Sequence, residues 1–100
     1  MIRHIVMFRL REFENETMKQ EALLLLKNRL EELPQKISLI RRCEVGIDVR
    51  KIEASYDIVL TMDFDNLTDL DMYTNHPDHQ AFIKFNKDYS VAKVCIDYEI

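Results

Sequence analysis

Residues 2–10 read IRHIVMFRL, and this stretch decides the fold because apolar side chains occupy both of its faces. Successive side chains of a strand point to opposite sides of a sheet, so the alternation predicts a β-strand. One face carries Ile2, His4, Val6, Phe8 and Leu10, and the other carries Arg3, Ile5, Met7 and Arg9. A strand that is apolar on both faces needs cover on both sides of its sheet. We therefore expect helices against one face and a second partner against the other.

The rest of the chain shows the periodicity of three helices and three more strands. Working outward from the first strand, we expect a helix from Thr17 to Pro34, strands at 42–50 and 56–64, helices at 67–75 and 78–89, and a strand at 91–100. Thr17 with Gln20 fits a capping box. Asp65 and Asn66 offer a cap for the second helix, and Pro77 should separate the two short helices. The only glycine, Gly46, is expected to mark a bulge or a close backbone approach within its strand.

The first helix should bury one broad apolar stripe. Its expected members recur at three- and four-residue spacing: Met18, Ala22, Leu25, Leu26, Leu30 and Leu33.

The order strand, helix, strand, strand, helix, strand is that of the ferredoxin-like βαββαβ arrangement, with the second helical region broken in two at Pro77. We expect one α+β domain over residues 1–100, with a four-stranded antiparallel sheet and the helices on one face. The strands at 2–10 and 56–64 should be central. Cys43 and Cys95 would then lie on opposite edge strands, too far apart for a disulfide.

The sheet face away from the helices carries an apolar group in its central strands: Ile5, Met7, Val59 and Thr61. An apolar face of this size left open to water is unusual in a monomer. A second copy of the chain is the economical cover. We expect a homodimer in which two such sheets pack face to face as a barrel.

Composition excludes several function classes. Hydrophobic residues make up 47% of the chain, charged residues 32%, and the net charge is −4. The basic residues form no stripe, which argues against nucleic-acid binding. The longest apolar run, Ala22 to Leu26, is far shorter than a membrane span. The N-terminal stretch lacks the uninterrupted apolar centre of a signal peptide, so we expect a cytoplasmic protein.

Residues 72–82, MYTNHPDHQAF, hold the strongest candidates for a site. Tyr73, His76 and His79 lie at spacings of three at the junction of the two short helices, and His4 lies on the strand face beneath them. One interpretation makes His79 a general base and Tyr73 a donor to an oxyanion. A second assigns the three histidines to a metal. A third is structural: His76 caps the end of the first short helix, His4 and His79 form local hydrogen bonds, and Tyr73 is a core aromatic.

The chain resembles the stress-responsive A/B barrel domain family, often called Dabb, over essentially its whole length. The matching features are the opening HIVMFRL, Leu33-Pro34, Glu44-Val45-Gly46, Tyr56-Asp57, Val59-Leu60, Phe64, Tyr73-x-x-His76-Pro77-x-His79 and Ile96-Asp97-Tyr98. The resemblance implies a dimeric α+β barrel that needs no metal and no cofactor. Many members of this family have no established activity, and some plant members are stress-protective.

One member, olivetolic acid cyclase, closes a linear polyketide by an aldol step. Its base and its supporting tyrosine match His79 and Tyr73, and another of its pocket histidines matches His4. Three functions therefore stay open. The first is a homodimeric binding or protective protein with a small apolar or carbonyl ligand, in a pocket lined by His4, Val6, Phe8, His76 and Phe82 as well as the two catalytic candidates. The second is a cofactor-free lyase or cyclase. The third is a cofactor-free monooxygenase or isomerase, since such enzymes share the architecture.

Overall fold

The computed structural model describes all 100 residues and contains four strands and three helices. In chain order they are β1 (Ile2–Leu10), α1 (Glu16–Lys36), β2 (Arg42–Ile47), β3 (Ile58–Phe64), α2 (Leu67–Thr74), α3 (Pro77–Asn86) and β4 (Ser90–Glu99). This is the expected ferredoxin-like α+β topology. The two short helices are separate elements, since the chain turns between Thr74 and Pro77.

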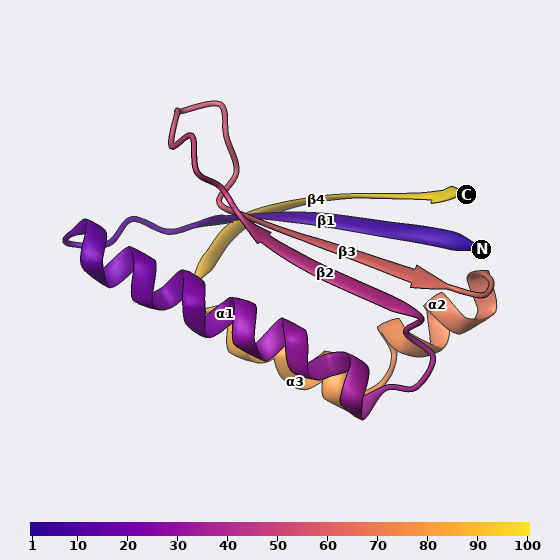
Figure 1. The fold of residues 1–100 in the computed structure, drawn as a ribbon. Coiled ribbons are helices and arrows are strands. Elements are labelled where there is room, and N and C mark those ends of the chain that lie inside the picture. The colour runs from indigo at the N-terminus through magenta and orange to yellow at the C-terminus, as the bar shows by residue number, and fades with distance from the viewer.

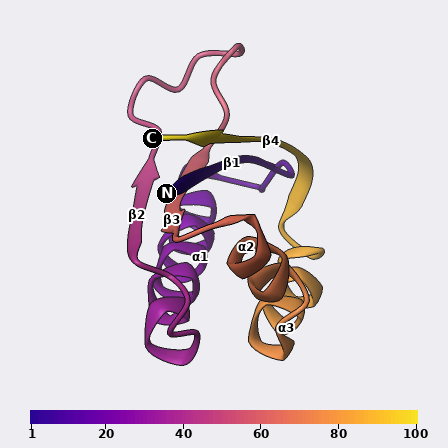
Figure 2. The same ribbon diagram turned by 90° about the vertical axis from the view of Figure 1, so that its right-hand side faces the viewer.

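The four strands form one antiparallel sheet in the order β2-β3-β1-β4, so the prediction that β1 and β3 are central is confirmed. All three helices lie against one face of this sheet (Figure 1). Figure 2 shows α1 beneath the β2 and β3 side, and α2 and α3 beside it, nearer the start of β4. Cys43 and Cys95 lie on the two edge strands and are free, as expected.

The first helix begins and ends differently from the prediction. Its N-cap is Asn15, whose side chain accepts a 2.9 Å hydrogen bond from the Met18 amide, and Gln20 bonds to Glu16 instead of closing a capping box with Thr17. Asn15 takes this position because its short side chain reaches the free amides of the first turn. The second helix does begin at an expected cap, Asn66.

Pro34 does not end α1, which continues to Lys36. A proline has no amide hydrogen, so the carbonyl four residues earlier, that of Leu30, loses its helical donor. The thiol of Cys43 on β2 approaches that carbonyl, with the sulfur 4.0 Å from the oxygen. The Ile37 amide then closes the last turn on Leu33. A contact from a neighbouring strand thus compensates for the proline.

The buried stripe of α1 is shifted from the predicted one. Leu23 is buried, whereas Met18 and Leu25 are exposed. The full buried set is Ala22, Leu23, Leu26, Leu30 and Leu33. In a run of four leucines, sequence spacing alone does not choose between adjacent stripes, and packing on the sheet selects the one that includes Leu23 and leaves Leu25 exposed.

Strand β2 ends at Ile47 rather than near residue 50, and β3 starts at Ile58 rather than at 56. The segment between them, residues 48–57, is closed by a 2.9 Å hydrogen bond from the Asp48 amide to the Asp57 carbonyl. It rises on the side of the sheet away from the helices (Figure 1). Gly46 causes no bulge in β2; a Cβ there would lie 3.2 Å from Val59, so the glycine permits a close approach to β3.

The core lies between the sheet and the helices, while the other face of the sheet is open. Five apolar side chains on this open face are exposed: Met7, Val94, Ile96, Tyr98 and Ile100. Three of them, on β1 and β4, are adjacent because the register pairs Met7 with Val94 and Ile5 with Ile96. None of the three helices has both the length and the hydropathy that a membrane span requires.

Candidate functional site

A cleft of about 530 Å³ opens between the helix-side face of β1 and β4 and the pair α2 and α3. Its volume falls in the range of small-molecule sites. Five apolar residues of its wall come from four elements: Val6, Phe8, Leu30, Leu60 and Phe82. Polar side chains line other parts of the wall. His4, Tyr73 and His79 are among them, so residues from β1, α2 and α3 meet in one hollow.

Tyr73 is held in the wall by α2 and is 1% exposed. Its ring packs against Phe64, His4 and His79, with ring centroids 5.0, 6.1 and 4.3 Å away. No hydrogen bond within the chain uses its hydroxyl, yet no buried side-chain polar atom lacks a partner. The hydroxyl therefore reaches the cleft. Burial raises the pKa of Tyr73 well above its usual range, so the group stays protonated and able to donate.

His79 lies one turn into α3, and its Nδ1 atom is 2.9 Å from the carbonyl oxygen of Thr74 at the end of α2. A carbonyl only accepts, so we assign the proton of the neutral ring to Nδ1. This leaves Nε2 with a free lone pair. Burial lowers the pKa of His79 below 6.5, and the charge of Lys93 adds to that shift. At neutral pH the ring is therefore an unprotonated base.

The same Thr74 carbonyl also accepts a 2.7 Å hydrogen bond from Gln80 Nε2. The last carbonyls of a helix have no partner within it and must be satisfied from outside. The sharp turn at Pro77 brings the first turn of α3 under the end of α2, so Gln80 and His79 supply the donors. Local helix-end chemistry thus fixes the orientation of His79.

His4 on β1 makes a short hydrogen bond from Nδ1 to a carboxylate oxygen of Asp97, which lies opposite it on β4. A carboxylate only accepts, so this bond also assigns the Nδ1 proton. The His4 ring meets the rings of Phe64 and Tyr73 edge to face. The Asp97 contact holds His4 on the same side of the cleft as Tyr73.

His76 does not lie in the cleft wall, contrary to the expectation that it lines the pocket. Its main-chain amide donates a 3.0 Å hydrogen bond to the Tyr73 carbonyl at the end of α2, as the structural interpretation expected, and the residue has a second role. It is the N-cap of α3, and its Nδ1 accepts a 3.1 Å hydrogen bond from the Asp78 amide. Pro77 forces residue 76 into an extended conformation, which is the backbone geometry that an N-cap needs. The side chain therefore folds over its own helix.

Three residues of β4 belong to the cleft and were not predicted: Lys93, Cys95 and Asp97. They lie opposite Phe8, Val6 and His4 in the antiparallel register, and directly opposed residues share a face of the sheet. The alternation in residues 90–99 does place these three residues on one face of the strand. The more conspicuous pattern there is the apolar set on the other face, Val94, Ile96 and Tyr98. No group of three or more His, Cys, Asp or Glu side chains in the chain lies where it could hold a metal ion.

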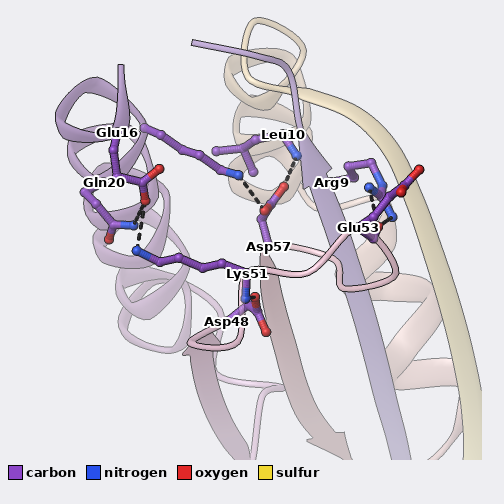
Figure 3. Close-up of polar contacts among 9 residues, drawn as sticks. Arg9, Leu10, Glu16, Gln20, Asp48, Lys51, Glu53 and Asp57 are labelled. Carbon is purple, nitrogen blue, oxygen red and sulfur yellow. Dashed lines mark hydrogen bonds and ion pairs between the residues drawn. The ribbon is translucent and has the colours of Figure 1, made fainter. Parts of the chain in front are cut away.

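A larger hollow, of about 680 Å³, lies where β1 ends, between the start of α1 and the segment 48–57, and shares Val91 with the cleft. Most of its charged side chains already pair with one another or with main-chain groups (Figure 3). These contacts are Lys51 with Glu16, Lys19 with Asp57, the Leu10 amide with Asp57, and Arg9 with the Glu53 carbonyl. The network ties the segment to α1 and β1, so the hollow is explained as a structural junction.

The two clefts therefore differ in what they leave free. In the cleft between β4 and α3, two imidazole nitrogens, the Nε2 atoms of His79 and His4, and the hydroxyl of Tyr73 have no partner in the chain. A base beside a hydrogen-bond donor can remove a proton from a bound molecule and stabilise the negative charge that forms.

Several solved structures with the same fold are described as dimeric proteins. A dimeric ferredoxin-like protein of unknown function from Bacteroides fragilis is 36% identical, with a TM-score of 0.87 over 99% of this chain and 95% of that one. A Dabb family protein from Mesorhizobium loti is 26% identical, with a TM-score of 0.73 and the same coverage, 99% and 95%. A hydroxynitrile lyase from Passiflora edulis is 16% identical, with a TM-score of 0.79 over 99% and 92%, and shares the fold. No curated protein matches the sequence.

Residues 2–100 match the family described as the stress responsive A/B barrel domain, Dabb. The match spans every strand and helix, including the turn that places His79. The chain therefore belongs to the Dabb family.

Proposed function

We propose that this protein binds a small apolar carbonyl compound in the cleft and removes a proton from the carbon next to the carbonyl, without a cofactor. The observation that carries the proposal is the pair of free groups: His79 Nε2 and the Tyr73 hydroxyl have no partner in the chain, and their rings lie 4.3 Å apart. Removing this proton creates a carbanion, and a carbanion can form or break a carbon–carbon bond. The proposed reaction therefore belongs to the lyase or cyclase class.

In the proposed reaction His79 Nε2 takes the proton as the C–H bond breaks. The bonding electron pair moves towards the carbonyl, and the negative charge develops on its oxygen. The Tyr73 hydroxyl donates a hydrogen bond to that oxygen. In an aldol closure the enolate carbon then bonds to a second carbonyl carbon of the same molecule. The new alkoxide takes the proton back from His79, so the ring returns to its starting state.

The pKa directions suit these roles. His79 is neutral at pH 7 because burial lowers its pKa, so it can accept a proton at once. Tyr73 stays a donor because burial raises its pKa. His4, held by Asp97, keeps its own Nε2 free to orient a second oxygen of the ligand.

A binding or protective role without chemistry is the second candidate, and the apolar wall around Phe8 and Phe82 supports it. Both functions need the same cleft. If the protein is an enzyme, replacing His79 should lower the rate of proton transfer. If the protein only binds a ligand, replacing His79 can change only the affinity for that ligand.

We also propose that the chain forms a homodimer through its open sheet face. Exposed apolar side chains on β1 and β4 support this, as do the related structures of dimeric proteins. Strand β4 is a long unpaired edge, and closing the two sheets into a barrel would cover it.

The test is proton transfer on benzoylacetone, a β-diketone whose keto–enol interconversion is followed by ultraviolet absorbance. The protein should accelerate it beyond the same concentration of free imidazole. His79→Asn keeps an amide donor for the Thr74 carbonyl but has no basic nitrogen, so the rate should fall by about 100-fold. His76→Asn is the matched control, because asparagine also caps a helix and residue 76 lies outside the cleft. Equal rates in the two variants would exclude the base role.

A further inference from the structure

Two lysines of the cleft have no acidic partner. Lys93 lies on β4 and Lys87 in the connection between α3 and β4, and both line the cleft. Neither takes part in any of the ion pairs of the chain. The one carboxylate of the cleft, Asp97, is bonded to His4.

This local positive charge is not a consequence of the overall composition. The chain has a net charge of −4. In the other large hollow, Lys19 and Lys51 are each bound to a carboxylate at 2.9 Å. Lys87 and Lys93 thus leave two unpaired ammonium groups beside the apolar wall of the cleft.

The register fixes where the Lys93 side chain originates. Lys93 lies opposite Phe8, and Asp97 lies opposite His4, so both are on the helix-side face of β4. They are four positions apart along the strand, a distance of about 13 Å between main-chain atoms. The charge of Lys93 also lowers the pKa of His79, so its ammonium lies within electrostatic range of the imidazole.

We propose that the ligand of this cleft is a carbonyl compound that also carries a carboxylate. The Lys93 ammonium binds this carboxylate at the end of the cleft where Lys93 lies opposite Phe8. The inference rests on the proposed function for the position of the reacting carbonyl near His79 and Tyr73. Phe8, which lies opposite Lys93, and Phe82, whose ring centroid is 6.3 Å from that of Phe8, line the same cleft and suit the hydrocarbon part of such a molecule. Lys93 then selects among carbonyl compounds by charge, and Lys87 adds to the same potential.

The test is a binding comparison by isothermal titration calorimetry with 4-phenylbutanoate and 4-phenylbutanamide. The two probes have the same shape and differ in charge, and neither needs a reaction to occur. The wild-type protein should bind the carboxylate about tenfold more tightly, as expected for a charge-assisted hydrogen bond. High salt should weaken the binding of 4-phenylbutanoate and leave the binding of 4-phenylbutanamide unchanged.

Lys93→Met should abolish this preference, since methionine keeps the apolar stem without the ammonium. Lys84→Met is the matched control: Lys84 is an exposed lysine on α3 outside the cleft, and its loss should keep the preference. Equal binding of the two probes, an unchanged preference in Lys93→Met, or no binding of either probe would overturn the inference. The last two results would leave Lys93 with the ordinary role of a lysine that protects an edge strand from unwanted pairing.

The two proposals fail separately. If His79→Asn leaves benzoylacetone turnover unchanged while the carboxylate preference depends on Lys93, the cleft is an anion-selective binding site and the catalytic proposal is wrong. If turnover depends on His79 but the two probes bind equally, the catalytic proposal stands and the carboxylate inference is wrong.

Discussion

The Nδ1 atom of His79 lies 2.9 Å from the carbonyl oxygen of Thr74, so the end of one short helix decides which imidazole nitrogen of the next helix stays free. The carbonyl needs a donor because it ends α2. His79 provides that donor, and its other nitrogen becomes the free base of the cleft. One contact thus serves both the fold and the proposed chemistry.

The first prediction concerns the pH dependence of His79. Its pKa lies below 6.5 in the folded protein, so the base form predominates at neutral pH and proton transfer should decline only as the pH falls below 6.5. The unfolded chain binds the proton more readily, so this group also makes the fold less stable below pH 6.5. NMR titration of the His79 ring should show the low pKa, and Lys93→Met should raise it. A ring that titrates above 6.5 would contradict the assignment.

The second prediction concerns Tyr73. Tyr73→Phe should reduce the rate of proton transfer by about 100-fold, the usual effect of losing one donor to an oxyanion. The free energy of unfolding should change by less than about 1 kcal/mol, because the hydroxyl makes no hydrogen bond within the chain. Benzoylacetone kinetics and urea unfolding measure the two quantities. A large loss of stability with an unchanged rate would identify Tyr73 as a structural residue.

The third prediction concerns the open sheet face. Ile96 on β4 and Leu24 on α1 are similarly exposed, at 59% and 55%, and α1 lies on the other side of the sheet from the open face. Ile96→Lys should convert the proposed dimer to a monomer, because it introduces a charge into the apolar contact. Leu24→Lys should leave the dimer intact. Light scattering coupled to size-exclusion chromatography at micromolar concentration distinguishes these results, and a monomeric wild-type protein would refute the proposal.

The fourth prediction uses the two cysteines as reporters. Burial raises the pKa of Cys43 to about 11, so it should react slowly with N-ethylmaleimide at pH 7.5. Cys95 is exposed and lines the cleft, so it should react first. Saturating 4-phenylbutanoate should protect Cys95 if the ligand occupies the cleft. Mass spectrometry of the labelled protein follows both sites, and faster labelling of Cys43 would contradict the burial of its thiol.

The sequence predicted the order of the elements and the faces of the strands because these follow from local periodicity. The alternation in residues 2–10 identified both the buried face of β1 and the apolar open face. The helix ends were less predictable. Asn15 and not Thr17 caps α1, and Pro34 lies within the helix, because a hydrogen bond from the Met18 amide and a contact from Cys43 decide these points.

The candidate site was predictable only in part. His4, Tyr73 and His79 were singled out by spacing and by resemblance to the family, and the fold brings them to one cleft. His76 has the same spacing but folds back onto α3, since Pro77 makes it an N-cap. Spacing along the chain did not distinguish these two histidines.

What the sequence determined by itself is the set of residues that share a face, since neighbouring side chains of a strand or helix are placed by the local backbone. Only the tertiary structure decided which faces meet. The register of β1 with β4 sets Lys93 and Asp97 opposite Phe8 and His4, more than eighty residues away along the chain. The packing of α3 against the end of α2 places the proton of His79 on Nδ1. Contacts between distant segments leave no periodic signal in the sequence, because they arise from packing and not from local backbone geometry.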